Sequence, residues 1–106
     1  MVETNYRLNN EKLEVVSELF EDAVLNRDLI TAIRTNTLIH AELFERYQEA
    51  ARLEKWANQF SGKEYDSIAI KTIRNRGRLR DRLISCEGAG RRLVWYYLFG
   101  NVMEEN

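Results

Sequence analysis

The sequence predicts an all-α protein, a small bundle of three long helices followed by a short C-terminal helix. Two observations lead to this fold class. No proline occurs among the 106 residues, and the helix interior is where proline is tolerated worst. Apolar residues also recur at spacings of three and four along most of the chain, which is the helical period. With 44% hydrophobic and 31% charged residues, the composition is globular, and the length fits a single domain, residues 1–106.

The first helix is expected to begin at Asn9 or Asn10, because asparagine is a favoured N-terminal cap. It runs to about Leu25, with apolar residues on one face. That face consists of Leu13, Val16, Phe20, Ala23 and Val24. The segment 26–28 is a short connection, and Asp28 is the expected cap of the second helix.

The second helix is predicted over 29–60, where neither glycine nor proline occurs. Its apolar stripe changes face partway along, so this helix is expected to touch two neighbours. An unbroken helix of this length would measure about 48 Å, and it would protrude from a compact domain of this size. Two alternatives stay open: the helix breaks at 35–37, or the protein is a homodimer through this helix.

The third helix is expected to start at a capping box, Ser61 with Glu64, and to run to about Cys86. Glycines within 87–90 predict a break. A short final helix over 91–99 then follows, with Gly100 as its C-terminal cap.

Charge is distributed unevenly along the chain. Residues 1–59 hold 7 Lys and Arg against 11 Asp and Glu, a net charge of −4, whereas residues 60–92 hold 9 against 4, a net charge of +5. The basic excess is concentrated in 71–82, KTIRNRGRLRDR. Such asymmetry indicates a binding surface, or a pairing between the two halves of the chain.

The arginines from 74 to 82 alternate, and a helix divides them into two groups. Arg74, Arg78 and Arg82 share one side. Arg76 and Arg80 lie between apolar residues, so we expect them at an interface, where each needs an anion because an unpaired buried charge is costly. That anion is a carboxylate of a partner chain, a phosphate, or a carboxylate from the acidic first two helices, such as Glu42, Glu45 or Glu49.

An aromatic cluster follows Arg91 and Arg92, and it contains Trp95, Tyr96, Tyr97 and Phe99. Three interpretations stay open for it: ordinary core at the end of the bundle, an interface hot spot, and a surface that stacks nucleic-acid bases.

No catalytic or metal-binding constellation is evident, so we expect a protein that is not an enzyme and uses no cofactor or metal. Cys86 and Arg92 have the spacing of the phosphate loop of cysteine phosphatases, but a predicted helix precedes them and Ala89 replaces the expected glycine. Arg34 and His40 have a spacing seen in helical ribonucleases of the HEPN type. His40 lies on the apolar stripe, however, which favours a hydrogen-bonded histidine in the core or in a helix seam.

These patterns favour a non-enzymatic interaction protein, a small adaptor, inhibitor or regulator that binds another protein through an Arg/aromatic surface. A nucleic-acid-binding regulator that uses the basic helix 71–92 is the alternative. We expect a cytoplasmic protein, since no signal peptide or membrane span is evident and a single cysteine fits a reducing compartment. The length of the second helix makes a homodimer the expected state. The residues expected to bind the partner or an anion are Lys71, Arg74, Arg76, Arg78, Arg80, Arg82, Arg91, Arg92, Trp95 and Tyr96.

Overall fold

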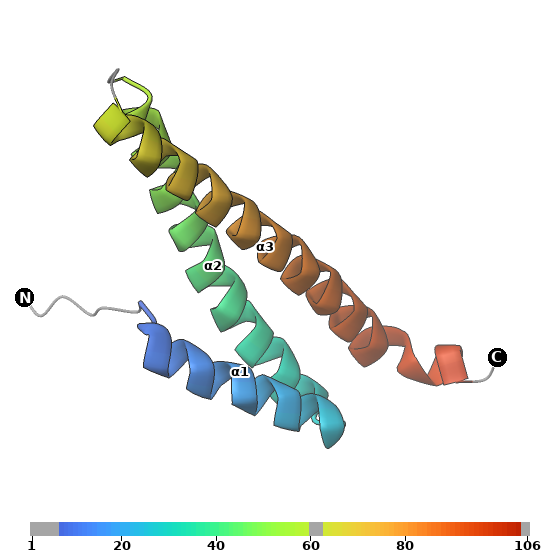
Figure 1. The fold of residues 1–106 in the computed structure, drawn as a ribbon. Helices are drawn as coiled ribbons and strands as arrows, with labels where there is room; N and C mark the ends of the chain where they lie inside the picture. Colours follow the sequence, from blue (N-terminus) through green and yellow to red (C-terminus); the bar gives the residue numbers. More distant parts are fainter. Residues whose placement is uncertain (1–6, 60–62, 105–106) are drawn as a thin grey trace, which may run out of the picture.

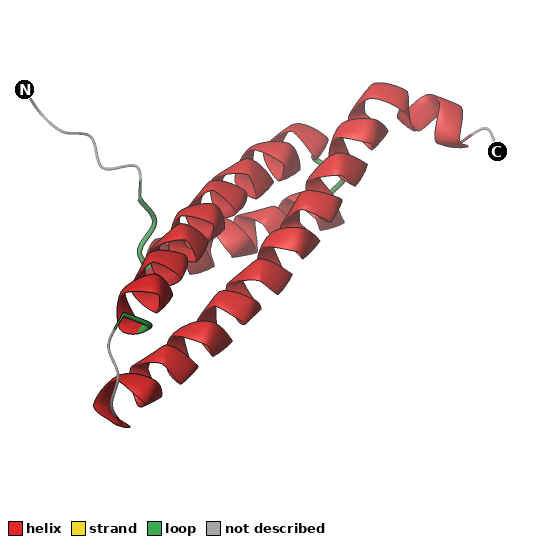
Figure 2. Cartoon of the chain, turned by 90° about the horizontal axis from the view of Figure 1, so that it is seen from above, coloured by secondary structure: helices red, strands yellow, loops and turns green. Residues whose placement is uncertain are grey.

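A computed structural model describes residues 7–59 and 63–104, except for the side chains of 63–66, 68–69 and 101–104. Three helices make up the fold: α1 (Asn10–Leu25), α2 (Leu29–Ala57) and α3 (Lys63–Glu104). This confirms the predicted all-α bundle, and the described ranges contain no strand (Figure 2). α2 and α3 form a long antiparallel pair, and α1 packs beside the first half of α2 (Figure 1). The predicted capping box at 61–64 lies outside the description.

Both helix starts predicted by capping residues are confirmed. The Asn9 side chain accepts a hydrogen bond from the Lys12 amide at 2.8 Å, and the Asp28 side chain accepts one from the Thr31 amide at 3.2 Å. Each cap satisfies a backbone donor that the first helical turn cannot satisfy itself. Between the two helices, Arg27 has a φ of 56°, in the left-handed region that favours glycine.

The second helix does not break at 35–37, so this alternative is wrong. The hydroxyl groups of Thr35 and Thr37 donate to the carbonyls of Thr31 and Ile33, both at 2.8 Å, within the same helix. The predicted change of apolar face has a simple cause, since both α1 and α3 pack on α2. The resulting molecule is elongated, with a radius of gyration of 17.8 Å, against about 13 Å for a compact domain of this size.

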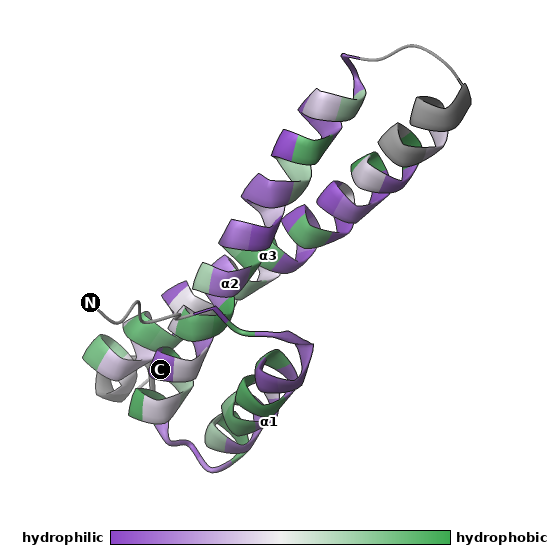
Figure 3. Ribbon diagram, turned by 90° about the vertical axis from the view of Figure 1, so that its left-hand side faces the viewer, coloured by the Kyte–Doolittle hydropathy of each residue, from purple (hydrophilic) through white to green (hydrophobic). Residues whose placement is uncertain are grey.

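The core is one cluster to which all three helices contribute. Leu43 of α2 is its most deeply buried large side chain. The other buried members are Leu13 from α1, Ile39 and Ala50 from α2, and Leu79, Leu83 and Cys86 from α3. Hydrophobic residues are most continuous in α1 and in the neighbouring parts of α2 and α3 (Figure 3).

The predicted break at 87–90 is wrong, because α3 continues to Glu104. The separate short helix over 91–99 and the cap at Gly100 are therefore wrong as well. Gly90 serves close packing: a Cβ there would lie 2.7 Å from Oδ1 of Asn36, a buried residue of α2. The Asn36 amide nitrogen in turn donates to the Cys86 carbonyl at 3.2 Å. A polar contact between α2 and α3 thus explains a glycine that resembles a helix stop.

Candidate protein-docking surface on the third helix

The C-terminal part of α3 exposes six consecutive large apolar residues. Their exposed fractions lie between 43% and 61%, in Val94, Trp95, Tyr96, Tyr97, Leu98 and Phe99. Consecutive residues point to every side of a helix. Even Tyr97 is 54% exposed, although it lies seven residues after Gly90, on the side that faces α2 earlier in α3. A continuous apolar surface of this kind marks an interaction site more often than a free surface.

Two aromatic rings in this segment, those of Trp95 and Phe99, pack against each other. The ring centroids of Trp95 and Phe99 lie 4.7 Å apart, with the ring planes inclined by 49°. This is a favourable arrangement for two aromatic side chains one helical turn apart. Because all four aromatic side chains are between 44% and 54% exposed, the aromatic cluster is a surface of α3, and the interpretation as ordinary core is wrong.

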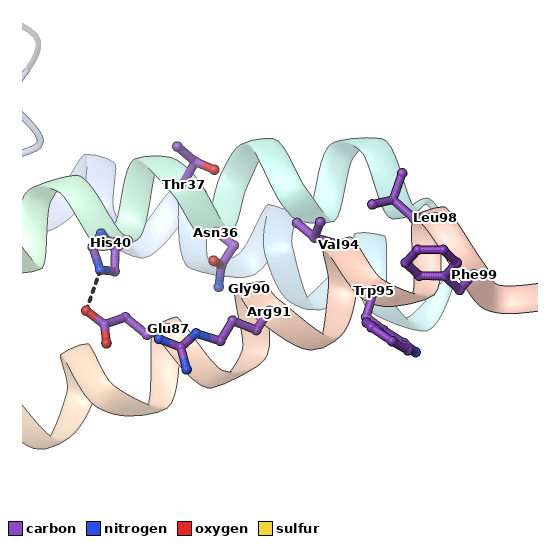
Figure 4. Close-up of a pocket in the computed structure, with 10 residues that line it drawn as sticks. All are labelled: Asn36, Thr37, His40, Glu87, Gly90, Arg91, Val94, Trp95, Leu98 and Phe99. Atoms are coloured by element: carbon purple, nitrogen blue, oxygen red, sulfur yellow. Dashed lines mark hydrogen bonds and ion pairs between the residues drawn. The ribbon is translucent and has the colours of Figure 1, made fainter. Parts of the chain in front are cut away.

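A hollow of about 610 Å³ opens between α2 and α3 on one side of this segment (Figure 4). Its polar end is formed by His40 and Glu87, whose Nε2 and Oε1 atoms lie 3.1 Å apart. The other end is apolar and includes Val94, Trp95 and Leu98. His40 also stacks on Phe44, with ring centroids 6.4 Å apart. The prediction of a hydrogen-bonded histidine in a helix seam is confirmed.

A larger groove, of about 850 Å³, lies between the start of α2 and the end of α3. The corner between α1 and α2 contributes Val24, Arg27 and Leu29, and α3 contributes Arg91, Arg92, Leu93, Trp95 and Tyr96. Four of the ten predicted binding residues thus line one groove. Arg91 and Trp95 also line the hollow of Figure 4, so the apolar surface continues from one side of α3 to the other.

The other predicted cations lie nearer the start of α3. Lys71, Arg74, Arg78 and Arg82 are all exposed. Spacings of three and four place these four residues along one side of the helix. Within the part of the chain that the structure describes, no carboxylate forms an ion pair with them. These four cationic side chains can therefore contact an anionic ligand.

Arg76 and Arg80 have different surroundings. Nε of Arg76 lies 2.6 Å from Oε2 of Glu54, whose side chain is mostly buried in the seam with α2. Arg80 is 64% exposed, and its ion-pair contact is to Asp81 at 3.9 Å. Among the described residues, Arg80 therefore forms no ion pair with α1 or α2, and its place at an interface with a partner or a phosphate stays a prediction. Two of the proposed acidic partners, Glu42 and Glu49, instead bind Arg7.

Replacing Arg76 with alanine is expected to lower the free energy of unfolding by about 1 kcal/mol, because the mostly buried Glu54 loses its cation. Arg80→Ala is the matched control and is expected to change stability by less than about 0.5 kcal/mol. Urea unfolding followed by circular dichroism measures both values. Equal effects of the two substitutions would contradict the structural assignment.

Cys86 does not have the surroundings of a nucleophile. Burial raises the pKa of its thiol, and residues 86–92 are helical, so they do not form a phosphate loop. Within the described ranges, no group of three His, Cys, Asp or Glu residues is arranged to hold a metal ion. The same ranges contain no helix that is long and apolar enough to cross a membrane.

Sequence reasoning did not find the contribution of Arg27, Val94 and Leu98 to these cavities. Arg27 lies far from 71–99 in the sequence, and only the fold places the α1–α2 corner across a groove from α3. Comparison of the chain with protein families, curated proteins and solved structures finds no significant match.

Proposed function

We propose that the protein is a non-enzymatic docking module, which binds another protein through residues 91–99 of α3. The exposure of six consecutive large apolar residues supports this proposal most strongly. Removal of apolar surface from water on binding stabilises a complex by about 25 cal/mol per Å² of covered area. Tryptophan, tyrosine and arginine are also the residue types enriched among those that dominate binding energy at protein interfaces.

The proposal is tested by capture of partners from cells that produce the protein, after nuclease treatment. A double variant, Trp95→Ala with Leu98→Ala, is expected to lose the captured protein and keep its helical content. The matched control is Trp56→Ala with Leu53→Ala, which removes the same residue types from similarly exposed positions, 45% and 47%, near the far end of α2. Equal capture by both double variants would contradict the proposal.

Nucleic-acid binding is the second candidate, and it is supported by the exposed row Lys71, Arg74, Arg78 and Arg82. If these four residues contact phosphates of duplex DNA, the logarithm of the association constant should fall with the logarithm of the salt concentration at a slope of about −3.6. Arg74→Ala with Arg78→Ala is expected to reduce that slope by about 2. Fluorescence anisotropy with labelled DNA and RNA measures the slope, and absence of binding at low salt would exclude this candidate.

We also retain the homodimer through α2 as a proposal, together with a location in the cytoplasm. Leu38 and Phe44 of α2 remain 49% and 42% exposed although α1 and α3 pack on this helix. A single, buried cysteine fits a reducing compartment. Sedimentation of the pure protein tests the dimer, and a monomer at all concentrations would exclude it.

A further inference from the structure

We infer that the groove between the α1–α2 corner and α3 takes an acidic amphipathic helix of a partner protein. This inference rests on the proposed docking function and specifies the chemistry of the partner. Three arginines surround an apolar floor, and they come from two separate segments of the chain: Arg27 from the corner, and Arg91 and Arg92 from α3.

The charged residues that line this groove, among those that the structure describes, are all cationic. Among the residues that the structure describes, no carboxylate forms an ion pair with Arg27, Arg91 or Arg92, and none lines the groove. Glu21 lines an adjoining hollow that Arg92 also borders. Nε of Arg92 donates to the Gly88 carbonyl at 3.3 Å, which leaves the outer nitrogens of this guanidinium for a ligand. Guanidinium groups bind carboxylates with paired, charge-assisted hydrogen bonds.

A ligand that fills this groove needs apolar groups against its floor as well as anionic groups for the arginines. Val24, Leu29, Leu93 and the rings of Trp95 and Tyr96 form it. Apolar side chains one turn apart on a docked helix would cover this floor, and carboxylates beside them would reach the arginines. A phosphate backbone would satisfy the arginines but leave the aliphatic residues of the floor uncovered. The combination therefore favours an acidic, apolar peptide segment.

Arg27 is the left-handed residue of the turn that ends α1, where its amide donates to the Val24 carbonyl at 3.1 Å and the Asp28 amide donates to the Ala23 carbonyl at 2.8 Å. Its φ of 56° is left-handed, a conformation in which glycine is favoured and a side chain costs free energy. An arginine at this strained position brings a guanidinium to the edge of the groove. Glycine is the commoner residue at this position of a helix end, so the turn itself does not require an arginine side chain there.

The test uses the intrinsic fluorescence of Trp95. The chain has two tryptophans, so Trp56→Phe leaves Trp95 as the only one. Two tryptophan-free peptides of about 16 residues share leucine and phenylalanine positions one turn apart, and their flanking residues are glutamate in one and lysine in the other. We expect the glutamate peptide to shift the Trp95 emission and to bind at least about tenfold more tightly than the lysine peptide.

In the same background, Arg27→Gly and Arg92→Ala are each expected to weaken binding of the glutamate peptide by about tenfold. Arg27→Gly suits the left-handed backbone, so this variant keeps its thermal stability and separates binding from folding. Arg34→Ala is the control, because Arg34 is an exposed arginine of α2 that does not line the groove. It is expected to leave binding unchanged.

Equal binding of the two peptides would overturn the acidic chemistry and leave the docking function standing. If neither peptide binds, the inference is overturned, while the capture experiment with Trp95→Ala and Leu98→Ala still decides the docking function. The inference also fails if an oligonucleotide displaces the peptide and depends on Arg27. It fails equally if the pure protein forms dimers that Arg27→Gly dissociates, because a second copy would then occupy the groove.

Discussion

Replacing Glu42 with alanine is expected to lower the free energy of unfolding by about 3 kcal/mol, since this removes a buried carboxylate that several partly buried donors share. The Glu42 side chain is only 3% exposed. It accepts from Arg7 through Nε at 3.0 Å and Nη2 at 2.9 Å, from Arg46 Nε at 2.8 Å and from the Leu8 amide at 2.8 Å. The substitution would leave these donors without their acceptor and release residues 7–9 from α2.

The matched control is Glu49→Ala. Glu49 also binds Arg7, through Nη1 at 2.6 Å, but its side chain is half-exposed. An exposed ion pair contributes at most about 1 kcal/mol. Urea unfolding measures both variants, and similar losses for Glu42 and Glu49 would contradict the role given to Glu42.

The same network predicts a pH dependence of stability. The hydrogen bond from Arg7, with further help from Leu8 and Arg46, lowers the pKa of Glu42 from 4.5 to about 2. Between these values the unfolded chain binds a proton more readily than the folded chain does. The stabilising contribution is therefore complete above about pH 4.5 and disappears as the pH falls towards 2. The stability difference between wild type and Glu42→Gln is expected to shrink over this interval, and a constant difference would refute the assignment.

Gly90→Ala is expected to lower the free energy of unfolding by about 2 kcal/mol, although alanine is the better helix former by about 1 kcal/mol. The added Cβ would lie 2.7 Å from Oδ1 of Asn36. Asn36 is buried and its side chain donates a hydrogen bond to the Cys86 carbonyl, so it has little freedom to move away. Gly77→Ala is the opposite case, because nothing lies within 4 Å of its Cβ position, and it is expected to raise stability by about 0.5–1 kcal/mol.

A double variant checks the cause of the Gly90 effect. Asn36→Ala removes the side chain that the new methyl group would meet, so Gly90→Ala should be tolerated better in that background than in wild type. Thermal unfolding of wild type, the two single variants and the double variant gives the coupling free energy between the two substitutions. Strictly additive effects would show that the contact between Asn36 and Gly90 is not the reason for the glycine.

The sequence predicts the helix starts well and one helix end badly. Asn9 and Asp28 act through local hydrogen bonds, and local chemistry is visible in the sequence. Gly88 and Gly90 have the appearance of a helix stop, but the reason for Gly90 lies on another helix, at Asn36. A requirement for space against a distant residue leaves no local pattern. The sequence therefore predicted α3 to be broken where the structure has it continuous.

The sequence predicts which residues form the candidate site, but it does not predict that their side chains are exposed. The cluster around Trp95 and Tyr96 is evident in the sequence, whereas its exposure depends on where α2 begins, at Leu29. Ion pairs were harder to predict, because every acidic residue of α2 was a plausible partner for Arg76. Register between the two helices selected Glu54, and Glu42 was already engaged by Arg7 and Arg46.

Photo-crosslinking from the end of α3 tests the docking surface most directly. A photoreactive amino acid in place of Tyr97 is expected to crosslink the protein, in the cells that produce it, to another polypeptide in a nuclease-resistant product. The same amino acid in place of Leu53, 47% exposed on α2, is expected to give no such product. A product from both positions, from neither, or only to nucleic acid would contradict a protein-docking role for residues 91–99.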